Sequence, residues 1–303
     1  MILNFPSFSA IDFKDKDEIA SFTRKYDTYS DYSFVNLFTW NTNDRAGISW
    51  LNGNLVIKLP DYLIKDKYIY LLIGDRNIDE TVAILIKEFG RLDLIPKFII
   101  ENLSHPEIYA IAEDRDSFDY VYRVEDIANL SGKRYKNKRN ALNNTLQELN
   151  NILELSSTSE LSQSVINEII GVKELWETQT SQSSEMIDSE STALKRLFEN
   201  FEEFELQVTL CRLDGKLNGF TIYEVVNDTY AICHFEKSIN TEFEGLGVVL
   251  ANKAAKSLLG KTEFVNWEQD LGIPGLRKSK RSYNPSHFQR KYWVSTGSSR
   301  STN

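Results

Sequence analysis

The sequence predicts an α+β protein, and three observations carry the prediction. Hydrophobic, β-rich runs such as KYIYLLIG and FELQVTLCRL are bounded by polar turn residues. Segments such as DETVAILIKEFGR place apolar residues at helical spacing. With 303 residues, of which 41% are hydrophobic, the chain can bury a large core, and its length indicates two domains.

The N-terminal third predicts helices, an antiparallel hairpin, a strand, a helix and a further strand. Two short helical patterns, DKDEIASFTRKY and YSDYSFVNLFTW, come first. AGISWL and NLVIKLP then flank Asn52-Gly53, a dipeptide that favours the tight type I′ turn of a hairpin. KYIYLLIG is the next strand, and the helix after it starts with an acidic turn and has Val82, Leu85, Ile86 and Phe89 on one face. KFIIENL is typical of a strand.

The middle of the chain predicts helices separated by polar loops. Residues 131–151 have Leu142, Leu146 and Leu149 on one helical face. VINEIIGVKELWETQ and STALKRLFENFEEF are further helices. We expect SSTSELSQS to be a loop or the entry to a helix, and SQSSEMIDSES to be a loop because it holds few apolar residues.

The C-terminal part predicts an antiparallel meander followed by a helix and a strand. Three β-rich runs, FELQVTLCRL, LNGFTIYEVV and TYAICHFEKSI, are joined by Asp214-Gly215 and Asn227-Asp228. The turn EFEGLG, the helix VVLANKAAKSLL and the strand EFVNWE follow. The tail STGSSRSTN is low in complexity, and we expect it to be disordered.

Composition narrows the class of protein. No run of 18 apolar residues predicts a membrane span, and the first residues lack the basic and apolar regions of a secretory signal, so we expect a cytoplasmic protein. Cys211 and Cys233 lie in apolar strands and are interpreted as buried thiols. The three histidines show no metal-ligand spacing, so we expect no metal site.

Positive charge gathers in two segments of an acidic chain. Residues 131–140 and 277–291 together carry +11 and no acid, so the rest of the chain carries −20 of a net charge of −9. Such isolated basic segments are candidate sites for an anion, whereas a solvated helix face is the alternative interpretation of each. The candidate phosphate-binding or substrate-binding residues are Lys133, Arg134, Lys136, Lys138, Arg139, Asn266, Arg277, Lys278 and Lys280.

A Gly-x-Gly turn opens the predicted helix after the meander. Backbone N–H groups at the start of a helix have no intrahelical acceptor and attract phosphate, and Gly245 and Gly247 allow a ligand to approach the backbone. Alone, such a turn is weak evidence for a binding site. The residues expected to contact a donor substrate here are Gly245, Leu246, Gly247 and Val248.

In this order of elements the chain resembles the GNAT superfamily of N-acetyltransferases. The superfamily's pyrophosphate loop has Gln or Arg, two further residues, and Gly-x-Gly or Gly-x-Ala, and the segment here reads Glu242-Phe-Glu-Gly245-Leu-Gly247. The glycines fit the pattern and Glu242 departs from it. The resemblance implies donor contacts along the fourth strand, at Phe235, Glu236, Lys237 and Ser238.

Longer motifs are similar to an uncharacterised bacterial family related to the C-terminal domain of phosphatidylglycerol lysyltransferase. These motifs are DYSFVNLFTW, LSGKRYKNKRNALN and NWEQDLGIPGLRKSKRSYNP. The resemblance implies two tandem GNAT-like domains, each with a mixed, mostly antiparallel sheet flanked by helices. The expected boundaries are 1–130 for a degenerate first domain without a Gly-x-Gly loop, 131–295 for a second domain with the donor loop, and 296–303 for the disordered tail.

In GNAT-type chemistry an amine attacks a carbonyl directly, and the enzyme positions the partners and removes a proton. A carboxylate shielded from water serves as the base, and Glu236, Glu268 and Asp270 are the candidates, with Glu268 preferred. Tyr283 is a candidate proton donor to the leaving group, although a packing role is the alternative. Ion pairs of Glu268 and Asp270 with Arg277 and Lys280 are the structural alternative for the acids.

Two functions remain open from the sequence. The first is an acyltransferase that moves an acyl or aminoacyl group from acyl-CoA or aminoacyl-tRNA, with no tightly bound cofactor, to an amine or hydroxyl acceptor. The Gly-x-Gly loop favours CoA, whereas Glu242, the basic segments and the family resemblance favour tRNA. The second is a catalytically inactive tandem-GNAT module that binds a nucleotide, RNA or an anionic lipid head group, with peripheral contact to anionic lipid.

Overall fold

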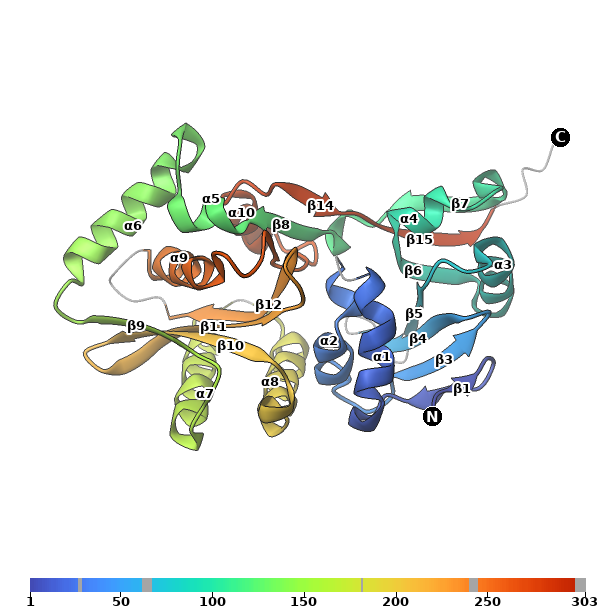
Figure 1. Ribbon diagram of the computed structural model, residues 1–303, viewed down its shortest axis with the longest axis horizontal. Coiled ribbons are helices and arrows are strands. Elements are labelled where there is room, and N and C mark those ends of the chain that lie inside the picture. The colour runs from blue at the N-terminus through green and yellow to red at the C-terminus, as the bar shows by residue number, and fades with distance from the viewer. Residues whose placement is uncertain (27–28, 62–66, 181, 240–244, 298–303) are drawn as a thin grey trace. The chain divides into compact units, whose positions relative to one another are not determined.

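The computed structural model describes residues 1–26, 29–61, 67–180, 182–239 and 245–297, and its ribbon is shown in Figure 1. The chain folds into two compact units. The first contains residues 1–119, 269–272 and 289–303, and the second contains residues 120–268 and 273–288. The α+β class is confirmed. The expected boundary between residues 130 and 131 falls inside the second unit, and the division into two tandem GNAT-like domains stays a prediction.

The first unit has two sheets with helices packed against them. In one sheet β1 (Leu3–Asn4), β3 (Gly47–Leu51), β4 (Asn54–Pro60) and β5 (Tyr68–Ile73) lie in that order, and β2 (Ser9–Ala10) also pairs with β3. The other has the order β6 (Arg91–Pro96), β15 (Lys291–Thr296) and β7 (Tyr109–Glu113). The helices are α1 (Lys16–Thr23), α2 (Phe34–Thr39), α3 (Ile78–Phe89) and α4 (Lys97–Glu101). Short 3₁₀ turns span Phe13–Asp15, Arg24–Tyr26, Ser30–Tyr32, Pro106–Ile108 and Arg115–Ser117.

Local signals predicted the β3–β4 hairpin, β5 and the helices α1, α2 and α3 of this unit. Asn52 and Gly53 have φ angles of 52° and 77°, as the type I′ turn between β3 and β4 requires. In α3 the apolar face is buried as its spacing predicted, and Gly90 ends the helix at φ 75° while its N–H donates to the Ile86 carbonyl over 2.8 Å. The prediction of a strand at KFIIENL is wrong, because Lys97 to Glu101 form α4 directly after Pro96.

The second unit is built on a sheet of seven strands in the order β14-β8-β13-β12-β11-β10-β9. These strands are β8 (Asp119–Arg123), β9 (Leu153–Thr158), β10 (Leu206–Leu213), β11 (Lys216–Val225), β12 (Tyr230–Ser238), β13 (Phe264–Asn266) and β14 (His287–Gln289). Its helices are α5 (Val124–Asn129), α6 (Lys136–Glu148), α7 (Gln163–Glu177), α8 (Ser184–Glu199), α9 (Leu246–Leu258) and α10 (Pro274–Arg281). Two 3₁₀ turns span Lys133–Tyr135 and Phe201–Glu203.

The predicted meander β10-β11-β12, the helix α9 and the strand β13 are confirmed in this order. Two loop predictions are wrong in part. Ser156, Ser157 and Thr158 belong to β9, which pairs with β10, and α8 begins at Ser184, so EMIDSES is helical. The Ser183 side chain caps α8 by accepting from the Met186 N–H, a start signal that the low apolar content concealed.

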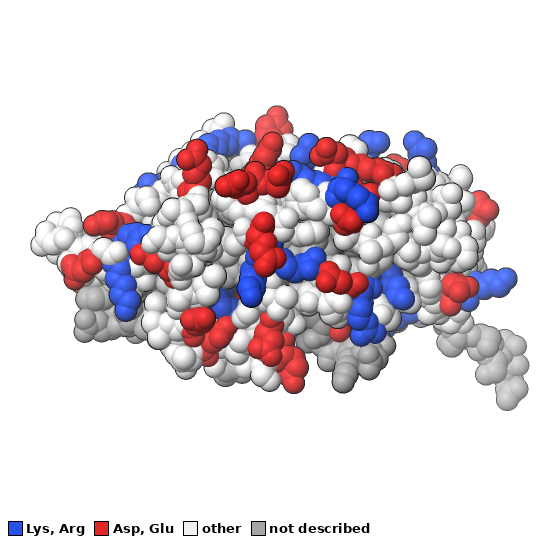
Figure 2. Space-filling model, turned by 90° about the horizontal axis from the view of Figure 1, so that it is seen from below, with Lys and Arg blue, Asp and Glu red and all other residues white. Residues whose placement is uncertain are grey.

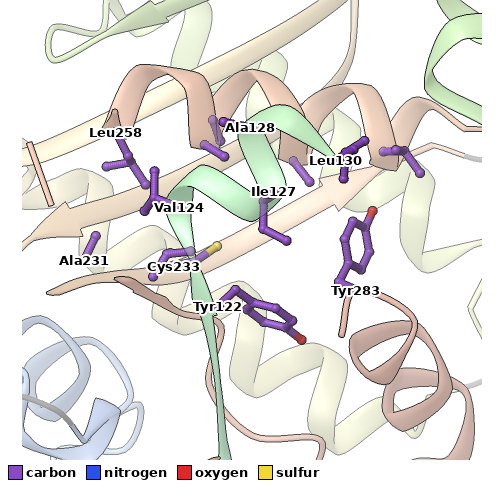
Figure 3. Close-up of a cluster of buried hydrophobic side chains, with 14 of the residues drawn as sticks. Tyr122, Val124, Ile127, Ala128, Leu130, Ala231, Cys233, Leu258 and Tyr283 are labelled. Atoms are coloured by element: carbon purple, nitrogen blue, oxygen red, sulfur yellow. The ribbon is translucent and has the colours of Figure 1, made fainter. Parts of the chain in front are cut away.

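Helices cover both faces of this sheet, with α9 on one face and α7 and α8 on the other (Figure 1). The core under α9 gathers residues from β8, α5, β12 and the chain after α10, and includes Tyr122, Ile127, Cys233 and Tyr283 (Figure 3). The Asn252 side chain of α9 donates to the Ile127 and Ala128 carbonyls at 2.9 and 2.8 Å, which fixes α9 against α5.

Two further expectations concern thiols and membranes. Cys211 and Cys233 are free and buried, as predicted. Burial raises the pKa of the Cys211 thiol to about 11, so this thiol stays protonated near neutral pH. None of the helices in the described ranges has the length and hydrophobicity that crossing a lipid bilayer requires. Thr296, the first residue of the expected disordered tail, ends the strand β15, so the prediction is wrong there, and residues 298–303 lie outside the described residues.

Candidate functional site

The strands β12 and β13 separate part-way along β12. They pair in parallel through three residues of each strand, with Ile232 opposite Asn266 as the last pair. β12 continues to Ser238, and the edge that it turns toward β13 has no strand beside it from Cys233 onward in the part of the chain that the structure describes. A strand edge beyond its last ladder pair is a place where main-chain groups can bind a ligand.

An extra residue in β12 determines which side chains share a face of the sheet. Phe235 lies opposite Ile222 and Cys233 opposite Tyr223, so His234 is the extra residue of a bulge. Thr221 and Tyr223 share a face of β11 because they are two residues apart. Their partners Glu236 and Cys233 therefore share that face too. Cys233 and Tyr223 pack with residues of α9, so Glu236 points to the α9 side.

The carboxylate of Glu236 lies in an unusual environment. Its Oε2 atom is buried and has no hydrogen-bond partner among the described residues. Burial raises the pKa of Glu236 to about 7, against the opposing effect of the charges of Lys280, Lys237 and Lys138. A carboxyl group that titrates near neutrality and has an unpaired oxygen is suited to accept a proton from a substrate.

The charges of Lys280 and Lys138 act on this carboxylate, and its charge acts in turn on Tyr283. The Lys138 Nζ lies 3.6 Å from the centre of the Tyr283 ring. Burial lowers the pKa of Lys138 to about 8, against the charge of Glu236. Burial and then the charge of Glu236 raise the pKa of the Tyr283 phenol far above its usual value, so Tyr283 stays protonated and can donate a hydrogen bond. We call Glu236, Lys138, Lys280 and Tyr283 the Glu236 cluster.

Glu268, the base that the sequence favoured, lies against His234 instead. Its Oε1 atom is 3.5 Å from the Nδ1 atom of His234. Its backbone has a φ of 54°, and its N–H donates to the Asn266 Oδ1 atom over 2.7 Å. Asn266, predicted as a substrate contact, is fully buried and holds this turn. The geometry therefore favours Glu236 over Glu268 as the base.

Asp270 belongs to the first unit, whereas Glu268 belongs to the second. Asp270 is fully buried, and its Oδ2 atom lies 3.3 Å from the Arg115 Nη1 atom. Its Oδ1 atom accepts the Gly272 N–H over 3.0 Å. These contacts give Asp270 a structural role, because it closes the turn before Gly272.

The start of α9 shows that Gly245 has a packing role. Gly245 has a φ of 107°, and a Cβ there would lie 2.4 Å from the Thr145 Oγ1 atom of α6. The space beside Gly245 is thus filled by protein. Gly247 differs, because a Cβ there would meet only the Ser238 Oγ at 3.4 Å. Leu246 and Val248 are buried in the core, so only their backbone can serve a ligand. Glu242 lies outside the described residues.

The residues expected as donor contacts on β12 divide between the two faces. Ser238 follows Glu236 by two residues and touches α9 at Gly247, so it lies on the same face as Glu236. Phe235 is buried, and Lys237 pairs with Glu190 of α8 at 2.8 Å and lies over the Trp176 ring of α7 at 4.0 Å. The side chains of Phe235 and Lys237 therefore point to the α7 and α8 side.

The two basic segments meet in the second unit, although some 140 residues separate them in the sequence. The Asn284 side chain donates to the Arg134 carbonyl over 3.2 Å, and Lys138 lies on Tyr283. Lys133, Lys136, Lys278 and Arg281 are exposed around this junction, whereas Arg139 is committed to the carbonyls of Leu130 and Gly132. We call these four exposed residues the basic surface. On the face shown in Figure 2, by contrast, acidic and basic side chains are interspersed.

Comparison with known proteins decides the family. The model of the phosphatidylglycerol lysyltransferase C-terminal family matches residues 23–295. The chain belongs to this family. The resemblance read from the motifs is thereby confirmed.

Three relatives show how far the likeness extends. The structure of a conserved protein of unknown function from Bacteroides thetaiotaomicron has a TM-score of 0.84 at 27% identity, covering 98% of this chain and 100% of that chain. The C-terminal domain of a putative lysylphosphatidylglycerol synthetase from Agrobacterium fabrum has a TM-score of 0.63 at 11% identity, covering 94% and 92%. An uncharacterised protein from Mycoplasmoides gallisepticum is 22% identical over 282 residues, 88% of this chain and 90% of the other.

In this member of the phosphatidylglycerol lysyltransferase C-terminal family, the structure adds residues that sequence reasoning missed. Thr221 lies opposite Glu236, and hydrogen bonding by its buried hydroxyl lowers the pKa of Glu236. Thr145 sets the need for glycine at 245. Neither carries a sequence signal, because each is defined by a contact across the fold. Within the described ranges, no group of three or more His, Cys, Asp and Glu side chains is placed to hold a metal ion.

Proposed function

We propose that this chain is a transferase that moves an aminoacyl or acyl group from a phosphate-rich carrier to an amine or hydroxyl acceptor, with Glu236 as the base. The observation that carries the proposal is the buried, unpaired Oε2 atom of Glu236, in a carboxyl group with a pKa of about 7. Membership of the phosphatidylglycerol lysyltransferase C-terminal family supports the reaction class.

The proposed step is a direct transfer at the fork between β12 and β13. The acceptor nitrogen or oxygen attacks the carbonyl carbon of the donor, a bond to this carbon forms, and its bond to the carrier oxygen or sulfur breaks. Glu236 takes the proton that the acceptor loses, and the leaving atom takes a proton from the protonated amine of Lys138 or from Tyr283. Main-chain N–H groups of β12 beyond its last pair with β13 stabilise the oxyanion.

We infer aminoacyl-tRNA as the donor class. The basic surface comes from the same two segments as Lys138 and Tyr283, which contact each other, so we expect its exposed cations to face the carrier. A nucleic-acid backbone binds to such cations, with an affinity that falls steeply as salt rises. Tyr135 and Tyr283 are buried, so they are not free to stack on bases, and backbone contacts are the expected mode.

The first experiment identifies the donor without a guessed substrate. The purified full chain is measured by native mass spectrometry for co-purified ligand. It is then incubated with tRNA charged with radiolabelled amino acids, or with acetyl-CoA, together with phosphatidylglycerol vesicles or a mixture of free amines. We expect label to move from tRNA to an acceptor. Transfer from acetyl-CoA alone would contradict the donor class while keeping the reaction.

Glu236→Gln tests the base. We expect transfer to fall by about 10²–10⁴-fold, the usual contribution of a general base. Glu263→Gln is the matched control, because Glu263 lies in the same unit in an exposed ion pair with Arg123 at 2.8 Å, and it should leave the rate unchanged. If carrier binds to both variants and wild type and no donor gives a product, the chain is a binding module.

A further inference from the structure

His234 occupies the point at which β12 parts from β13. It is the bulge residue of β12, two positions beyond the last pair of Ile232 with Asn266. Its side chain is completely buried. A buried histidine at a bulge next to an open strand edge is well placed to control the geometry of that edge.

The imidazole of His234 lies between two carboxylates. The Nε2 atom is 3.2 Å from the Glu224 Oε2 atom, and the Nδ1 atom is 3.5 Å from the Glu268 Oε1 atom. Neutral histidine has one N–H donor and the imidazolium has two, so only the protonated ring donates to both acids.

The two acids belong to segments on opposite sides of β12. Glu224 is on β11, opposite Ile232. Glu268 follows β13, and its carbonyl accepts the Tyr120 N–H of β8 over 3.1 Å. The imidazole thus ties the chain that leaves β13 to the strand on the far side of the bulge.

We propose that His234 is a positioning residue that, as an imidazolium held between Glu224 and Glu268, fixes the width of the fork at which Glu236 stands. The expected effect of His234 on the transfer rate rests on the proposed function, whereas the contacts of the imidazolium with the two acids do not. We call His234, Glu224 and Glu268 the His234 clamp.

The charges around the clamp agree with a protonated ring. Burial lowers the pKa of His234, but Glu224 and Glu268 outweigh it and raise the pKa to about 9. Glu236 and Lys237 are the charged neighbours on β12, and Lys280 of α10 is a further cation near this strand. The ring should therefore stay charged through neutral pH and lose its proton as pH rises through about 9.

Nuclear magnetic resonance of the full chain labelled with ¹⁵N-histidine tests the clamp directly. The chain has three histidines, so His105→Gln and His287→Gln assign the spectrum. We expect both ring nitrogens of His234 to keep imidazolium shifts up to about pH 8, and His287, whose pKa burial lowers, to be neutral at pH 7. A neutral tautomer of His234 at pH 7 would overturn the proposal.

His234→Gln separates positioning from simple packing. We expect faster amide hydrogen exchange in residues 233–238 and 266–268, with the β9–β10 pair unchanged. We also expect kcat to fall by about 10²-fold, as a misplacement of about 1 Å can cause, with KM for the carrier nearly unchanged. His105→Gln, which removes an exposed contact to Glu107 at 3.0 Å, is the control.

The two proposals fail in different ways. If wild type shows the imidazolium signature and the exchange change but no transfer, the clamp stands and the proposed function falls. If His234→Gln leaves exchange and kcat unchanged, the positioning role is wrong even where transfer is active. If the variant does not fold, the wild-type titration still decides whether the clamp is charged.

Discussion

Two groups of buried charges, one in each unit, differ in how fully their charges are paired. In the first unit Lys291 is completely buried, and its Nζ atom contacts Asp31 and lies 2.6 Å from the Asp119 Oδ1 atom. Ser30 donates to Asp119 through its N–H at 2.8 Å and its hydroxyl at 2.9 Å. In the second unit the Glu236 carboxylate makes no ion pair within the described residues, and its Oε2 atom has no hydrogen-bond partner there.

The difference between the two groups indicates which buried charges serve structure and which suit catalysis. In the Lys291 network (Lys291, Asp31, Asp119 and Ser30) each charge meets an opposite charge, and the two carboxylates raise the pKa of Lys291 to about 12 although burial opposes its charge. The ion pairs of this network explain why its charges are buried, and no catalytic role is needed. In the Glu236 cluster the pKa values of Glu236 and Lys138 move toward neutrality, to about 7 and about 8, which a purely structural pair does not need.

The largest expected effect lies in the Lys291 network. Lys291→Met removes the cation and leaves Asp31 and Asp119 buried without it, so we expect the free energy of unfolding to fall by about 3–5 kcal/mol. Urea unfolding followed by circular dichroism measures the change. Lys97→Met is the control, because the Lys97–Glu101 pair is exposed, and it should change stability by about 0.5 kcal/mol or less. A loss below about 1 kcal/mol for Lys291→Met would contradict the comparison.

The second prediction concerns the stability contributed by Glu236. The pKa of Glu236 in the folded chain is about 7, above the value of 4.5 expected for an exposed glutamate, so the folded state holds the proton more tightly than the unfolded state. Stability should therefore fall as pH rises from about 4.5 to about 7, by an amount on the order of 2 kcal/mol. Glu236→Gln should remove this decline, so the variant is the more stable protein above pH 7 while it loses activity.

Measurements of unfolding at a series of pH values decide this point. The informative quantity is the difference between wild type and Glu236→Gln, because other groups titrate alike in both. A difference that stays constant between pH 5 and pH 8 would show that Glu236 is an ordinary ionised carboxylate, and the contrast with the Lys291 network would then disappear.

The third prediction separates packing from binding at the start of α9. Gly245→Ala adds a Cβ that meets the Thr145 Oγ1 atom at 2.4 Å and requires a φ of 107°, so we expect a loss of about 1–3 kcal/mol in stability. Thr145→Ala in the same chain should recover the part caused by the clash. Gly247→Ala meets only ordinary contact with Ser238 at 3.4 Å and should cost less. Equal losses at both positions would contradict the packing role.

The comparison also shows which features local sequence can predict. The turns at Asn52-Gly53 and Asp214-Gly215 were predictable because each needs positive φ angles that their own residues supply. The strand β15 was missed because its partners are β6 and β7, far away in the chain, so nothing in its own residues identifies the pairing.

The candidate site followed the same rule. Glu236 was among the candidate bases, but its preference over Glu268 depends on a bulge of one residue at His234, which decides the face toward which Glu236 points. A bulge has no strong local signature here. The meeting of Lys138 with Tyr283 likewise depends on the packing of α6 against the chain after α10.

The smallest expected effect tests whether the Glu236 cluster titrates as a unit. The charge of Lys138 lowers the pKa of Glu236, after the larger effects of Lys280 and Lys237. Lys138→Met should therefore raise the pKa of Glu236 by less than about one unit, while stability changes by less than about 1 kcal/mol because no opposite charge loses an ion-pair partner. The pH at which the wild-type decline in stability ends should move upward by the same amount.

Lys136→Met, an exposed cation on the same helix, is the matched control and should leave that pH in place. An unchanged pH in Lys138→Met would mean that Lys138 and Glu236 do not interact, and proton transfer between the acceptor and the leaving group would then need a donor other than Lys138.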